Sequence, residues 1–416
     1  MIFTALLASL LAAPAAGSEA SPAEGADGTQ AWTLGHVKLG AYAGGFDGRG
    51  VRTASGGAAL VEGTAAPTMK TGAWKLDVPL RFHHFQTFGA SLSETYGSAS
   101  VGIEDRVAKA LRLGASLGLS GAWRPDWPDL YQPQANNPSP SGGFELTPTN
   151  RYSYLAWHAG ASLGVTPFAR NHLRLKYQYV HTGYVRDPNF RLDRPMHLTP
   201  RDNGQHRLES SWRAFGDGYA VAARFEYVHR QDEVYLARNA VTGLTNFYTT
   251  PYQRLDRMEP SVEVTVKRLA DRLDVSLQYG YQIQDDLYQG YYSYSGHHPR
   301  LTVEYAFTER FSARVEGEAW LLEYGPSSKA AGLPPDPTVP GRLENGTRLY
   351  DRRGAVGATA SYAFTKRLAA KLKGEWVRRS TNYPDYVPGY YPSTKLYDIE
   401  WRYVNTLVVA GVELRL

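Results

Sequence analysis

Charged side chains of opposite sign recur two residues apart along this chain. Three pairs show the spacing: Arg224 with Glu226, Arg314 with Glu316, and Lys373 with Glu375. Successive side chains of an extended strand point to opposite faces, so residues two apart share a face. Charges on one face can orient polar solutes through their field, or they can neutralise one another on a surface that faces water. We expect mutual neutralisation for most of these residues.

The same alternation predicts a charged, water-facing lining assembled from many strands. We predict that the lining contains Arg112, Arg174, Lys176, Arg224, Glu226, Glu263, Asp274, Glu304, Arg314, Glu316, Glu318, Lys373 and Glu375. Basic and acidic residues nearly balance in this set. The sequence therefore predicts weak selectivity between anions and cations for any solute that passes along the lining.

Catalytic or metal-binding chemistry is not indicated by the histidines. The eleven histidines are scattered, and two adjacent pairs, His83-His84 and His297-His298, have no carboxylate beside them in sequence at a ligand-like spacing. No H-E-x-x-H motif occurs. We predict a protein that is not an enzyme, with no catalytic residues, no metal site and no cofactor.

Tyrosines are concentrated in two segments, 285–298 and 382–403. The residues concerned are Tyr288, Tyr291, Tyr292, Tyr294, Tyr386, Tyr390 and Tyr391. Tyrosine rings can stack on the apolar faces of sugars, which would suit a saccharide ligand. The alternative is that they pack the loops together or belong to a band of aromatic residues at a membrane surface. We expect both segments to be extracellular loops.

The elements that carry these residues are strands. In the segment 300–324, Leu301, Val303 and Tyr305 alternate with Thr302 and Glu304, and the alternation resumes after a polar turn at 307–310. A period of two indicates a β-hairpin with one apolar and one polar face.

Comparable strands are expected to start near residues 111, 152, 171, 204, 218, 257, 273, 298, 311, 353 and 367. Short turns are predicted at 107–111, 167–171, 215–218, 268–272, 307–310 and 364–367, and longer loops separate the remaining strand ends. Short connections at one end and long ones at the other are typical of transmembrane β-barrels. We predict an all-β, up-and-down antiparallel barrel of about 16 strands, with 14 or 18 as alternatives.

The strands nearest the N-terminus are patterned least clearly. We expect them at 33–45, 52–64, 72–85 and 98–107. Pro79 falls inside the third of these, where it removes a ladder hydrogen bond, so we predict a local bulge there.

Composition limits the other classes of protein. The chain has 29 Tyr, 41 Gly, no Cys and a formal charge of +5, without a basic run, so no nucleic-acid partner is implied. The mean hydropathy is −0.41, and the barrel region contains no apolar stretch of the roughly 20 residues that a spanning helix needs. Residues 1–15 are predicted to be a secretory signal peptide ending at Ala13-Pro14-Ala15, residues 16–32 a flexible segment and residues 33–416 the barrel.

The final segment of the chain, 402–416, has an apolar face made of Val408, Ala410, Val412, Leu414 and Leu416. It resembles the C-terminal strand of Gram-negative outer-membrane β-barrel proteins, although these usually end in Phe where this chain has Leu416. The resemblance implies location in the outer membrane of a Gram-negative bacterium, contact with outer-membrane lipid, insertion by the barrel assembly machinery and, at this size, a porin-like channel.

Three functions remain open at this point. The first is a channel for polar solutes, including saccharides. The second is a conduit for secretion of a polysaccharide, and the third is a structural or adhesive barrel that acts through its extracellular loops. The solute and the oligomeric state do not follow from the sequence.

Overall fold

The computed structural model describes residues 31–33, 35, 37–49, 54–88, 93–123, 127–129, 147–149, 153–184, 202–237, 251–269, 272–288, 293–324, 350–381 and 403–416. The predicted signal peptide, most of the flexible segment and most of the long loops lie outside these ranges. Within them, no helix has the length and apolar character that crossing a membrane would require.

The described elements are strands. From the N-terminal side they are β1 (Ala31–Thr33), β2 (Lys38–Arg49), β3 (Ala54–Ala65), β4 (Thr68–Thr71), β5 (Trp74–Asp77), β6 (Leu80–Phe88), β7 (Ser93–Ala108), β8 (Leu111–Trp123), β9 (Trp127–Asp129), β10 (Thr147–Thr149) and β11 (Tyr154–Val165). They continue as β12 (Asn171–Tyr184), β13 (Asn203–Phe215), β14 (Tyr219–Leu236), β15 (Tyr252–Leu269), β16 (Leu273–Asp286), β17 (Tyr294–Ala306), β18 (Phe311–Tyr324), β19 (Tyr350–Ala363), β20 (Leu368–Thr381) and β21 (Tyr403–Arg415).

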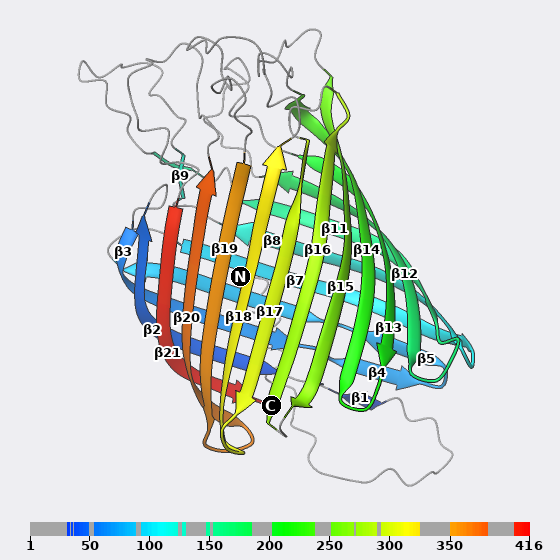
Figure 1. Ribbon diagram of the computed structural model, residues 1–416, viewed down its shortest axis with the longest axis horizontal. Coiled ribbons are helices and arrows are strands. Elements are labelled where there is room, and N and C mark those ends of the chain that lie inside the picture. Colours follow the sequence, from blue (N-terminus) through cyan, green and yellow to red (C-terminus); the bar gives the residue numbers. More distant parts are fainter. Residues whose placement is uncertain are drawn as a thin grey trace. The chain divides into compact units, whose positions relative to one another are not determined.

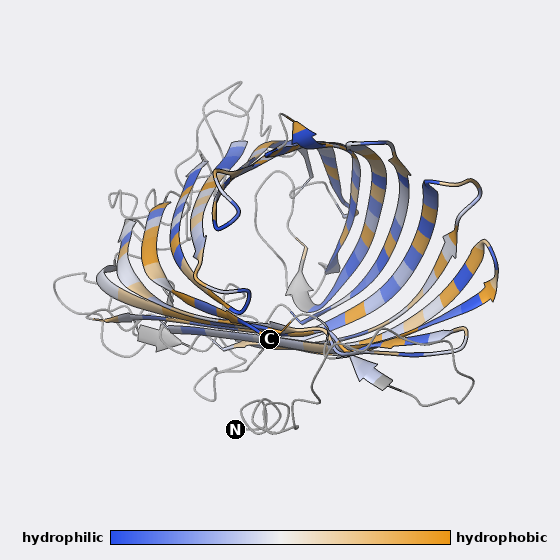
Figure 2. Ribbon diagram, turned by 90° about the horizontal axis from the view of Figure 1, so that it is seen from below, coloured by the Kyte–Doolittle hydropathy of each residue, from blue (hydrophilic) through white to orange (hydrophobic). Residues whose placement is uncertain are grey.

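Each barrel strand pairs antiparallel with the next one along the chain, and β21 pairs with β2 to close the ring. At this seam Lys38 lies opposite Arg415, and the Leu416 amide donates to the Val37 carbonyl at 3.0 Å. Counting β3 with β4 and β5 with β6 as single wall strands, the barrel has 16 strands, as predicted. Figure 2 shows the strands around the ring, with hydrophilic and hydrophobic residues alternating along them.

The short turns predicted from the sequence gather at one end of the barrel. Lys109–Ala110 joins β7 to β8, and the turns at 307–310 and 364–367 join β17 to β18 and β19 to β20. The seam ends of β2 and β21 lie at this same end, which is the lower end in Figure 1. We call it the short-turn end. The long connections leave from the other end.

The first strands differ from the sequence prediction in position. The first barrel strand is β2, at Lys38–Arg49 rather than 33–45, and β3 is at Ala54–Ala65 rather than 52–64. Strand β7 begins at Ser93, five residues before the predicted start at 98. Glycine and alanine dominate β2 and β3, so the apolar alternation that marks strand ends elsewhere is weak there.

The predicted bulge at Pro79 is wrong. Asp77 pairs with Gly102 and Leu80 with Ala99, so two residues lie between the pairs on both strands and the register does not shift. The strand is interrupted between β5 and β6 instead. Pro67 interrupts the neighbouring strand between β3 and β4, and the Val78 amide donates to its carbonyl at 2.9 Å. Two prolines beside each other therefore remove two ladder donors without changing the pairing.

Candidate pore-lining site

Register places every residue of the predicted lining on the same face of the barrel wall. Lys176 lies opposite Glu209, Glu209 opposite Glu226, and Glu226 opposite Glu259. Glu263 and Gln278 lie opposite each other on the same face, four residues further along β15. The other face carries the exposed large apolar side chains, such as Leu117, Leu277 and Val412, which are 61%, 55% and 51% exposed. We call the charged face the interior face. Some of its side chains bond across an intervening strand, as His298 does to Glu259 across β16.

The ion pairs on this face are not the ones that sequence spacing suggested. Arg224 donates to Glu263 on the next strand at 2.5 Å, and Arg257 donates to Glu226 at 2.7 Å. Lys373 bonds Glu62 rather than Glu375. Of the three pairs two residues apart, only Arg314 and Glu316 are joined, at 3.0 Å. The charges share a face, but neighbours on adjacent strands compete with neighbours on the same strand as ion-pair partners.

A cluster at the seam was not singled out in the sequence. Glu413 is almost fully buried and accepts hydrogen bonds from Lys371 at 2.5 Å and Arg415 at 2.8 Å. Beside it, the Lys373 ammonium lies 4.1 Å from the centre of the Tyr42 ring, whose hydroxyl donates to a Glu62 oxygen at 3.2 Å. No short-range signal could have found this cluster, because β2, β3, β20 and β21 are far apart in sequence.

His297 and His298 are consecutive in β17, so their side chains point to opposite faces of the barrel wall. His298 faces the interior, where its Nδ1 lies 2.8 Å from a Glu259 oxygen and its ring stacks on Trp320 at 4.6 Å. His297 faces outward, with its Nδ1 2.6 Å from the Tyr279 hydroxyl. The carboxylate partner of His298 therefore comes from β15, across β16. The sequence around the histidines does not show it.

Two G-x-S-x-G stretches occur, at 114–118 and 160–164. This motif marks a nucleophile only where a strand turns sharply into a helix. Here both stretches lie within strands, β8 and β11, which pair with each other. They place Gly114 opposite Ser162 and Ser116 opposite Gly160 on the interior face, and they form a patch of small side chains rather than a nucleophile elbow.

Among the residues that the structure describes, no group of three or more His, Asp or Glu side chains is arranged to hold a metal ion.

The predicted aromatic loop residues are only partly described. Tyr288 follows β16, and Tyr294 begins β17 rather than lying in the loop. The Tyr294 hydroxyl donates to Gln282 at 2.9 Å, and its ring meets Tyr324 edge-on at 5.5 Å. Tyr291, Tyr292, Tyr386, Tyr390 and Tyr391 lie outside the described residues.

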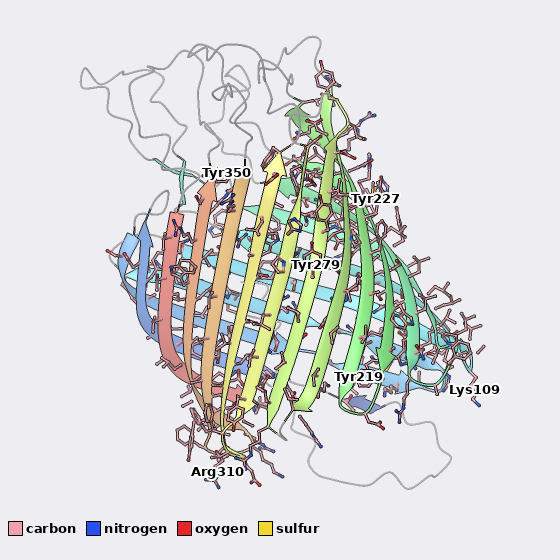
Figure 3. All side chains as sticks on the ribbon, in the orientation of Figure 1. Lys109, Tyr219, Tyr227, Tyr279, Arg310 and Tyr350 are labelled. Carbon is pink, nitrogen blue, oxygen red and sulfur yellow. The ribbon has the colours of Figure 1, made fainter. Side chains whose placement is uncertain are left out.

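Aromatic residues also mark both ends of the barrel. At the short-turn end Phe168, Phe307 and Phe364 are exposed just before their turns, and Phe307 stacks on Phe311 at 4.9 Å. Figure 3 shows Arg310 at this end and Tyr350 near the opposite one. Aromatic bands at two levels are typical of the two surfaces of a membrane.

No family model matches the chain, and no curated protein matches it in sequence. Solved structures with similar folds include OprB of Pseudomonas putida, at 9% identity and a TM-score of 0.48, covering 92% of this chain and 94% of that one. The trimer form of OmpT, an outer membrane protein of Vibrio cholerae, has 11% identity and a TM-score of 0.45, covering 93% and 100%. OccD3 of Pseudomonas aeruginosa has 10% identity and a TM-score of 0.42, covering 92% and 91%. The chain itself is a closed 16-strand antiparallel β-barrel.

Proposed function

We propose that this chain is a porin-like channel through the outer membrane of a Gram-negative bacterium, for small polar solutes. The observation that carries the proposal is the division of the barrel wall into two chemically different faces. Exposed Leu, Val, Ile and aromatic side chains cover one face, while Arg, Lys, Asp and Glu cover the other.

Each face requires a matching surrounding. The apolar outer face is stable against lipid, and a closed ring leaves no backbone edge unpaired in the hydrocarbon. The charged interior face is stable only against water or polar solutes. Barrels of 16 to 18 strands are too wide for side chains alone to fill and typically hold an aqueous channel.

Orientation follows from the connections. Outer-membrane barrels keep short turns on the periplasmic side and longer loops outside the cell. We therefore place the short-turn end, with the seam ends of β2 and β21, in the periplasm. Outer-membrane lipid and the barrel assembly machinery are the partners that this placement requires.

The test is ion conduction by the purified protein in a planar lipid bilayer. Stepwise current increases on insertion are expected, with a stable conductance for each step. A protein that enters the bilayer, shown by protease protection, but never conducts would contradict the channel and favour a structural barrel.

Saccharide transport remains a prediction from the tyrosine-rich segments. An oligosaccharide added on the extracellular side should reduce the current in a concentration-dependent way. Replacing Tyr291, Tyr292, Tyr390 and Tyr391 by Ala should relieve the block with little change in open-channel conductance, because ring faces and not charges would be lost. A conducting pore that is indifferent to every glycan tried would leave a general channel for polar solutes.

A further inference from the structure

Within the strands that the structure describes, several interior cations form no salt bridge with a carboxylate. Four of them, Arg174, Lys176, Arg207 and Arg213, lie on the adjacent strands β12 and β13, and we call them the basic column. Arg213 lies opposite His172, Arg174 opposite Ser211, Lys176 opposite Glu209, and Arg207 opposite Gln178. From position 172 to position 178 the column covers roughly 20 Å of strand, at about 3.3 Å per residue.

Many of the other interior cations are paired with a carboxylate. The pairs are Arg112 with Glu104, Arg224 with Glu263, Arg230 with Asp232, Arg257 with Glu226, Arg314 with Glu316, Lys371 with Glu413, and Arg379 with Asp351. Within the described part of the chain, no salt bridge joins a carboxylate to any member of the basic column. Arg207 instead donates to the neutral Gln205 amide oxygen at 2.7 and 3.1 Å.

The one carboxylate within the column does not cancel it. Glu209 lies opposite Lys176 in the ladder but forms no salt bridge with it. Arg174 and Arg213 are both exposed on the interior face, towards the short-turn end. The column itself therefore holds four positive charges and one negative charge. Glu226, on the next strand and opposite Glu209, is paired with Arg257.

The wall beside the column supplies space. On β11, Gly164 lies opposite Arg174, Ser162 opposite Lys176 and Gly160 opposite Gln178. On β8 the same rows continue as Arg112, Gly114 and Ser116. Apart from Arg112, which is paired with Glu104, the interior positions of this flank are all glycine or serine. A solute against it would meet the guanidinium and ammonium groups without displacing a large side chain.

We propose that the basic column is a binding surface for anionic solutes that carry a carboxylate or phosphate group, engaged as they pass through the channel. This rests on the proposed function and specifies its solute class. Guanidinium groups bind carboxylate and phosphate through two parallel charge-assisted hydrogen bonds, and the lysine adds a point charge between them. The arrangement replaces the expectation of uniformly weak selectivity, because the interior charges balance in number but are separated in space.

The experiment measures block of the potassium chloride current by inorganic phosphate and, separately, by citrate. Wild-type protein should be blocked by both. The double variant Arg174→Gln/Lys176→Gln should need about tenfold more of either anion for half-block. The matched control is Arg224→Gln/Arg314→Gln, which removes the same charge from cations already held by Glu263 and Glu316. The half-blocking concentration of this control should stay within about twofold of wild type, because the two arginines that it removes are already paired with carboxylates and do not bind the anion.

The outcomes separate this inference from the function on which it rests. A wild-type channel that conducts but is not blocked by either anion, or equal losses of block in both double variants, would overturn the basic column as a binding surface. Failure to conduct at all would overturn the channel itself. Faster gel migration of unheated samples establishes that both variants are folded before they are compared.

Discussion

At the scale of single residues, the free-energy cost of introducing a charged side chain depends on the face of the barrel wall to which it points. Leu277 and Gln278 are neighbours on β16, but Leu277 is 55% exposed on the outer face and Gln278 lies on the interior face opposite Arg300 and Glu263. The two positions share a strand, a depth and a backbone environment. They therefore form a matched pair for testing which face meets lipid.

The substitution Leu277→Arg should destabilise the folded barrel by about 2–4 kcal/mol, because a charge near the bilayer midplane loses its hydration. The substitution Gln278→Arg should be tolerated. Urea unfolding in lipid vesicles measures both. Equal effects of the two changes would show that the two faces have been assigned wrongly.

Glu413 and Glu316 both pair with an arginine but differ in burial. Glu413 is 4% exposed and bonds Lys371 and Arg415, whereas Glu316 is 44% exposed and bonds Arg314. The substitution Glu413→Ala leaves two cations without their partner and should cost about 3 kcal/mol. The substitution Glu316→Ala should cost less than about 1 kcal/mol. The same unfolding measurement compares them, and a larger loss for Glu316→Ala would contradict the burial argument.

At the scale of elements, we expect the β4–β5 hairpin tip beyond the two prolines to be less stable than the strands it continues. Strands β4 and β5 are only four residues each, and the ladder that connects them to β3 and β6 lacks the donors of Pro67 and Pro79. Short strands beyond a break in a ladder can open without the rest of the sheet.

Backbone amides in 68–77 should therefore exchange with solvent about tenfold faster than those in 57–65. Hydrogen exchange followed by mass spectrometry in detergent micelles resolves the two segments. The control is the β19–β20 hairpin, whose strands contain no proline and pair without a gap. Equal protection across the prolines would show that the interruption has no energetic effect.

Sequence reasoning located most elements because alternation is a local property. The hairpin at 300–324 is observed as β17 and β18, with the polar turn at 307–310. It was less accurate for β2 and β3, where glycine and alanine blur the contrast between faces. It gave the face of each charged residue but not its partner, because the partner depends on register. The bond from Lys373 to Glu62 joins residues 311 positions apart.

At the scale of the whole molecule, we expect the closed ring to make the barrel resistant to unfolding by detergent. Closed barrels keep every wall strand hydrogen-bonded on both sides, so unfolding has no free edge at which to begin. The protein should fractionate with outer membranes and migrate faster in detergent gels when it is not boiled than when it is boiled. Recovery as a soluble monomer without detergent would contradict the membrane assignment.

Because β2 pairs with β21, the chain could begin at a different strand without changing which strands pair. The Val37 and Leu416 backbones exchange hydrogen bonds at 3.4 and 3.0 Å, so the first and last wall strands end side by side. Every other wall strand pairs with the next one in sequence. The order of strands around the ring therefore does not depend on which strand comes first in the chain. A gene that joins residue 416 to residue 37 through a short linker and opens the chain at Asp217, in the exposed turn between β13 and β14, would specify a circular permutant with every strand beside its present neighbours.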